Sequence, residues 1–177
     1  MRIPALLAAT ATAATAITGL TTTTAVSATS SPSTDGTTTH ERGNVVECGA
    51  AYAGQDTFVS VYENNLHPDV FQVVVGEDGL GRGKESTTGF IDAGTVRATM
   101  RLDGRKVVVS GTAKRVGKRI AVHEEVDDAG EHVVVDGFHR RLRTDLTLRW
   151  KGRTVALDCD EAFFYDLDVT RYDTTGD

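Results

Sequence analysis

The sequence predicts an all-β protein with one antiparallel domain. From Asn44 onward, apolar and polar residues alternate with a period of two, and glycine-containing turn motifs separate the alternating segments. No segment longer than a turn has helical spacing. Eight to ten strands in one compact domain close into a barrel or fold into two layers. We favour an up-and-down β-barrel, with a two-layer β-sandwich as the alternative, because consecutive short hairpins indicate up-and-down order.

Ten segments have the alternating pattern, and turn chemistry sets their register. The strands are expected at 44–49, 57–63, 69–76, 95–102, 105–114, 119–126, 131–138, 143–150, 153–159 and 163–171. Asp103 and Gly104 predict a two-residue hairpin loop, which pairs Met100 with Val107. Comparable turns at 115–118, 127–130 and 150–153 predict the pairs Ala113–Ile120, Gly111–Val122, Val126–Glu131, Val122–Val135 and Leu148–Val155. In this register the apolar residues share one face, which is the expected core.

The first 28 residues predict a cleaved signal peptide. Basic Arg2 precedes an apolar run rich in Ala and Thr, and Val26 and Ala28 are the small residues expected before a cleavage site. The threonines, and the lack of a basic flank, disfavour a membrane anchor. Residues 29–43 are dense in Ser, Thr and Gly and predict a flexible leader, followed by the β domain at 44–177. We therefore expect a secreted, extracellular protein.

Charge and cysteine content restrict the partners and the compartment. The formal net charge is −6 at pH 7, which disfavours nucleic acid or an anionic membrane as the main partner. The basic stretch at 139–143 is interpreted as a solvated strand end. Outside the cell, Cys48 and Cys159 predict a structural disulfide that joins the first strand to the penultimate one.

The stretch AVHEEVDDAGEHVVV at 121–135 contains the residues best suited to a metal. In the predicted register, His123, Glu125 and His132 lie on the face opposite the valines, and Glu125 lies across from His132. Such a set suits Zn²⁺, but cross-strand polar pairs on a solvated face are the favoured explanation. We predict no cofactor and keep these three residues as the candidate metal ligands.

Glu124 is predicted on the apolar face, where an isolated carboxylate is costly. Three interpretations stay open: it reaches water at the barrel rim, it pairs with Arg119 or Lys118, or it is an acid–base group in a cavity. Together with Val96 and Met100 it forms the candidate ligand-binding set. The segment 76–90 is the longest break in the strand pattern and predicts a mobile loop.

No catalytic motif is recognisable. In GLGRGKES at 79–86, Lys84 is followed by Glu85 rather than Ser or Thr, so the segment does not match a phosphate-binding loop. The sequence thus favours a non-catalytic β-domain that binds a small ligand, a protein or a cell-envelope component. The alternatives are a small-barrel enzyme using Glu124 as its acid–base group and a secreted enzyme inhibitor. Enzyme activity is left open, with a non-catalytic role favoured.

The signal sequence, VHEEVDDAG, HRRLRTDL and DCDEAFFYDLDVT resemble a group of small secreted actinobacterial proteins of unknown function. The resemblance covers most of the mature domain. It implies secretion and supplies no catalytic residues.

Overall fold

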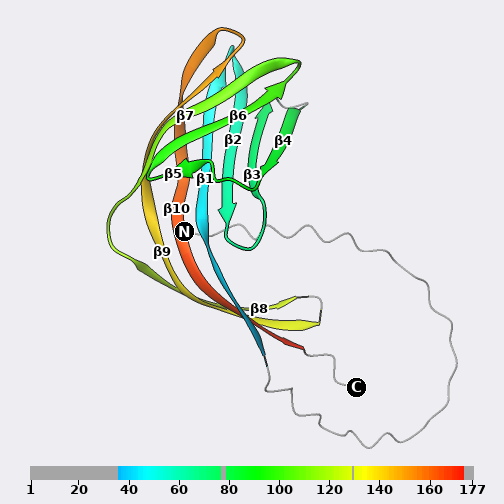
Figure 1. Cartoon of the computed structure of the whole chain (residues 1–177), viewed down its shortest axis with the longest axis vertical. Coiled ribbons are helices and arrows are strands. Elements are labelled where there is room, and N and C mark those ends of the chain that lie inside the picture. Colours follow the sequence, from blue (N-terminus) through cyan, green and yellow to red (C-terminus); the bar gives the residue numbers. More distant parts are fainter. Residues whose placement is uncertain (1–35, 77–78, 129, 174–177) are drawn as a thin grey trace, which may run out of the picture. The chain divides into compact units, whose positions relative to one another are not determined.

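In the computed structural model, residues 36–76, 79–128 and 130–173 are described. The predicted signal peptide and the first part of the predicted leader lie outside them. The described residues form ten strands (Figure 1). These are β1 Thr37–Tyr52, β2 Gln55–Asn64, β3 Asp69–Val75, β4 Leu80–Ser86, β5 Ile91–Asp92, β6 Thr95–Leu102, β7 Arg105–Arg115, β8 Ile120–Asp128, β9 Glu131–Trp150 and β10 Arg153–Asp173.

The prediction of an all-β antiparallel domain is confirmed. The strands form one antiparallel sheet in the order β4-β3-β2-β1-β10-β9-β7-β6-β5, and β8 pairs with β9 outside this order. The sheet curls into a half-barrel, and β4 and β6 approach each other without pairing. At this seam the Lys84 Nζ donates a hydrogen bond of 3.2 Å to the Thr99 carbonyl.

Three strands of the half-barrel extend beyond it, and a fourth strand, β8, joins them there. The N-terminal part of β1, the C-terminal part of β10 and the N-terminal part of β9 pair with one another, and β8 pairs with β9. We call this four-stranded extension, residues 37–42, 120–128, 131–139 and 165–173, the ribbon. Figure 1 shows β1, β9 and β10 running from the curled part into the end that holds β8.

The core lies on the inner face of the curl. Alternate residues of β2, β3, β6, β7 and the half-barrel parts of β1, β9 and β10 are buried there. The largest fully buried side chains are those of Phe71, Leu102, Leu146, Leu148, Val46, Val59, Val61, Val73, Val96, Val107 and Val109. Because alternation along β1 is unbroken from Val46 back to His40, the inner face of the ribbon continues this core face. The opposite side of the sheet is called the outer face.

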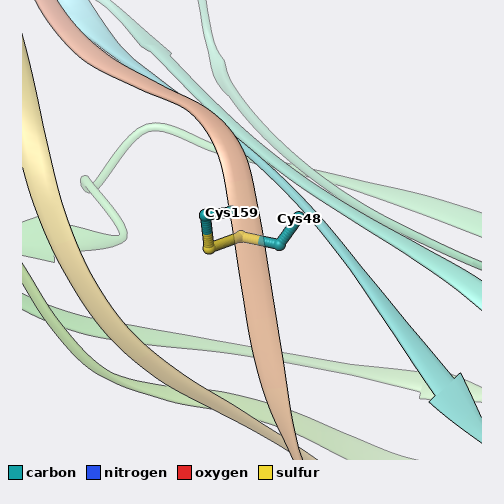
Figure 2. Close-up of a disulfide and its surroundings, with 2 residues drawn as sticks. All are labelled: Cys48 and Cys159. Atoms are coloured by element: carbon teal, nitrogen blue, oxygen red, sulfur yellow. A yellow bond between two sulfur atoms is a disulfide. The ribbon is translucent and has the colours of Figure 1, made fainter.

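The predicted disulfide is present, although it joins different strands from those expected. Cys48 and Cys159 bridge β1 and its neighbour β10, and Figure 2 shows the disulfide crossing β10 toward Cys48 on β1. The predicted strands 153–159 and 163–171 are one strand, so Cys159 lies on the last strand and not on the penultimate one. The register of β10 against β9 shifts between Leu157 and Phe163, and this bulge places Cys159 and Ala162 on the same inner face.

The predicted strands 131–138 and 143–150 are also one strand, which runs through Gly137 with unbroken pairing to β8 and β10. This glycine has a φ of +150°, and a Cβ at its position would lie 2.2 Å from the Asp166 carbonyl oxygen. A side chain is therefore excluded by both conformation and space. The close contact at Gly137 lets β9 serve the half-barrel and the ribbon without a break.

The predicted hairpin between 105–114 and 119–126 is wrong. Arg115 pairs with Leu142 and Ile120 pairs with His139, so β7 and β8 lie on the same edge of β9 and do not pair with each other. The connection 116–119 runs along that edge, where the Val116 N–H donates to the Arg141 carbonyl at 2.9 Å. The long β9 provides one edge for both strands, which local turn chemistry at 115–118 does not reveal.

The other register predictions divide into confirmed and shifted pairs. Met100–Val107 and Leu148–Val155 are confirmed. In the β8–β9 hairpin, Val126 pairs with Val133 rather than Glu131, a shift of two residues. An even shift leaves every side chain on its predicted face, so the grouping of residues survives.

Two segments predicted as irregular are strands. Thr37 to Gly43, in the predicted leader, pair with β10 from Arg171 to Tyr165. Within the predicted loop 76–90, β4 pairs with β3 from Leu80 to Ser86, and residues 77–78 lie outside the described chain. Both segments lack apolar alternation, because their backbone pairing is not accompanied by a fully buried face.

Candidate functional site

Histidine–carboxylate pairs line the inner face of the ribbon. The His123 Nδ1 lies 2.7 Å from the Asp136 Oδ1, and its Nε2 lies 3.5 Å from the Glu125 Oε1. The His132 Nδ1 lies 2.7 Å from the Asp127 Oδ1. The predicted juxtaposition of Glu125 and His132 is absent, since Glu125 pairs with Val134 in the shifted register.

A third pair was missed because it begins in the predicted leader. The His40 Nδ1 lies 2.8 Å from the Asp168 Oδ1, and its Nε2 lies 3.3 Å from the Asp166 Oδ1. The hydrogen bond and the negative charge of Asp136 raise the pKa of His123 above its usual value, and Glu125 adds to this effect. Over residues 36–76, 79–128 and 130–173, no three His, Cys, Asp or Glu side chains form a group that could hold a metal ion.

The valines of the β8–β9 hairpin share a face as predicted, but it is not the core face. Val122, Val126, Val133 and Val135 lie on the outer face of the ribbon, and 49% of Val126 is exposed. Glu124 lies among them and is exposed to solvent. The prediction of an inward-facing carboxylate is therefore wrong, because the alternation of β8 assigns residues to faces without showing which face the core covers.

The candidate ligand-binding set is separated by the fold. Val96 is a core residue that is 1% exposed, and Glu124 lies on the distant ribbon. Met100 contributes to an open pocket of about 430 Å³ at the β4–β6 seam, which we call the seam pocket. Its lining residues are Arg82, Gly83, Lys84, Thr99, Met100, Arg101 and Lys106. The basic lining was not predicted, because β4 was expected to be a loop and does not pair with the β6–β7 hairpin that completes the pocket.

A buried carboxylate was also missed. Glu63, which is 7% exposed, lies near the end of β2. Its Oε1 accepts hydrogen bonds from the backbone N–H groups of Phe90 (2.6 Å) and Ile91 (2.7 Å). Its Oε2 accepts one of 2.7 Å from the Asn44 side chain. The two backbone hydrogen bonds hold Phe90 and Ile91 against the half-barrel, and the third joins Glu63 to Asn44 of β1, so Glu63 has a structural role.

Comparison with known proteins assigns no family to the chain. No protein-family model matches the chain, and neither a curated protein nor a solved structure matches it. The described part of the chain contains no helix long and apolar enough to cross a membrane.

Proposed function

We propose that this chain is a secreted, non-catalytic binding domain that recognises an anionic ligand at the seam pocket. Its support is the composition of that pocket, which four basic side chains line together with Met100 and no carboxylate. The volume of about 430 Å³ is in the range used for small-molecule recognition.

The charge of the pocket runs against that of the chain. The protein has 25 acidic and 19 basic residues, yet Arg82, Lys84, Arg101 and Lys106 gather at one seam. Within the described residues, none of these four side chains has a carboxylate partner within ion-pair distance. A ligand carrying a negative group beside an apolar part would complement both the cations and Met100.

The enzyme and inhibitor alternatives gain less support. Glu124, the acid–base candidate, is solvent-exposed on the outer face, whereas His123 and His132 lie on the inner face. The segment 76–90, the longest predicted loop, is largely the strand β4, paired along its length with β3, so it does not offer a free loop for an inhibitor. Secretion rests on the signal-peptide pattern, and the Cys48–Cys159 disulfide is compatible with an extracellular site.

Native mass spectrometry of the protein purified from the medium of a secreting host tests this proposal. We expect a bound anionic species that the R82Q/K106Q double variant loses. The control, R149Q/R153Q, removes two exposed charges outside the seam pocket and should keep the ligand. A bare protein mass in the wild type, or equal retention by both double variants, would overturn the proposal.

A further inference from the structure

Four arginines converge at the junction between the half-barrel and the ribbon, where β7 leaves the edge of β9 and β8 joins it. Arg42 of β1, Arg115 of β7 and Arg140 of β9 lie on the inner face, and Arg119 ends the connection 116–119. We call these four residues the arginine cluster. They come from four segments of the chain, so only the folded sheet brings them together.

Two phenylalanine rings organise the cluster. The Arg115 Cζ lies 3.4 Å from the centroid of the Phe164 ring, and the Arg42 Cζ lies 5.4 Å from the same centroid. The Arg119 Cζ lies 4.3 Å from the Phe138 centroid, and the two rings are 6.1 Å apart. Stacking on aromatic faces fixes the planes of the guanidinium groups while leaving their N–H edges available.

The Asp166 carboxylate is close enough to raise the pKa of Arg115, but no ion pair forms at the arginine cluster within the described chain. None of its guanidinium groups forms an ion pair with a described residue, and the Arg140 Nε is buried without a hydrogen-bond partner. Burial, and then repulsion from Arg42 and Arg140, lower the pKa of the Arg115 guanidinium. Asp166, which opposes this effect, contacts the His40 Nε2 at 3.3 Å. Arg42, Arg115 and Arg119 are exposed to solvent, whereas the buried Arg140 donor is costly unless an acceptor completes it.

We propose that the arginine cluster is a binding site for a compact phosphate-type oxyanion, either free phosphate or the phosphate group of a larger ligand. Each guanidinium presents parallel N–H donors that match two oxygens of such a group. Several guanidinium groups around one point favour an anion with three or four oxygens and more than one charge over a single carboxylate. The site is separate from the seam pocket, and its proposal stands without the proposed function.

The carboxylates next to the arginine cluster limit the length of the anion that it can bind. Along the inner face of the ribbon, Asp136 of β9 pairs with Asp168 of β10, and Glu125 and Asp127 lie on β8. A long polyanion leaving the cluster in that direction would meet these carboxylates. We therefore expect the cluster to take a single phosphate group and to gain little from a chain of them.

Nuclear magnetic resonance of the full secreted protein tests the proposal directly. Titration with inorganic phosphate should shift the Nε–H resonances of Arg115 and Arg140 in a saturable way, because these donors would acquire an acceptor. Sulfate should compete, and acetate should not. A long polyphosphate should bind no more than a few-fold tighter than phosphate at low salt. Absence of saturable shifts up to tens of millimolar phosphate would overturn the inference.

A matched pair of variants separates specific binding from general attraction. R140Q should weaken phosphate binding at least tenfold, whereas R141Q should leave it unchanged, because Arg141 is adjacent in β9 but lies exposed on the outer face. R115K retains the positive charge but loses the parallel N–H donors of the guanidinium group, and should also weaken phosphate binding. R82Q/K106Q should have no effect on this titration. Equal weakening by R140Q and R141Q would refute the assignment, and thermal melting of each variant checks that it is folded.

Discussion

Removing the buried carboxylate of Glu63 should detach the segment before β5 from the half-barrel. In the E63A variant, the N–H groups of Phe90 and Ile91 and the side-chain amide of Asn44 lose their acceptor. Phe90 is 5% exposed and its ring centroid lies 5.9 Å from that of Phe71, so its N–H cannot turn to solvent without withdrawing the ring from the core.

The structure sets the size of the effect. A buried donor left without a partner costs about 1–3 kcal/mol, and a hydrogen bond to a charged group is worth about 1.5–3 kcal/mol. Ile91 is half-buried and water can replace part of its loss, so we expect E63A to reduce the free energy of unfolding by about 3–4 kcal/mol. For a domain of this length, that corresponds to a Tm lower by roughly 10–14 °C.

Urea denaturation followed by tryptophan fluorescence measures the free energy of unfolding of E63A, since Trp150 is buried in the core. E63Q keeps one oxygen for the two backbone donors, and the Asn44 amide can reorient toward the new amide, so it should lose only about 1 kcal/mol. E85A, at an exposed glutamate of β4, should stay within about 0.5 kcal/mol of the wild type. A loss below about 1 kcal/mol in E63A would refute the structural role of Glu63.

Three further perturbations test other parts of the fold. Replacing Cys48 and Cys159 by alanine opens a loop with a sequence separation of 111 and should cost about 4–5 kcal/mol in calorimetry; an unchanged Tm would contradict this. G137A should reduce the free energy of unfolding by at least about 2 kcal/mol and speed amide hydrogen exchange in the ribbon before the half-barrel, whereas uniform exchange would argue against a close contact local to Gly137. His123 should titrate above its usual pKa of 6.5 in NMR, and its pKa should return toward that value in D136N. Its stabilising contribution is complete below pH 6.5 and is lost as the pH rises through the folded-state pKa. A pKa of His123 that D136N leaves unchanged would rule out the pair.

Local sequence chemistry predicted the fold well where a turn has only one good solution. Asp103–Gly104 and the loop at 150–153 fix their hairpins because the left-handed residues leave little choice of register. The same reasoning failed at 115–118, because pairing of β7 and β8 with the common strand β9 depends on the length of β9. That length is hidden by Gly137, which the sequence places at a strand end and which the structure places inside β9, paired with Val122.

The functional residues were harder to predict because alternation assigns side chains to two faces without naming the buried one. Val126 and His123 were placed on opposite faces, which is confirmed, but the inner face of the ribbon carries the histidine. Glu63 stands beside Asn64 and Asn65 in a stretch that resembles a polar turn, so nothing marked it as buried. In the basic stretch 139–143, Arg140 faces inward, whereas His139 and Arg141 face outward. Only the register against β10 distinguishes them.

The uninterrupted course of β1, β9 and β10 has a mechanical consequence. A linker between two recognition modules normally lets each reorient, whereas here hydrogen-bonded strands connect the arginine cluster to the rest of the sheet, and the Cys48–Cys159 bridge clamps two of them. A phosphate-bearing molecule held at the junction would thus be presented at a set angle to whatever occupies the seam. Ligands at the arginine cluster and at the seam pocket would therefore keep a fixed relative orientation.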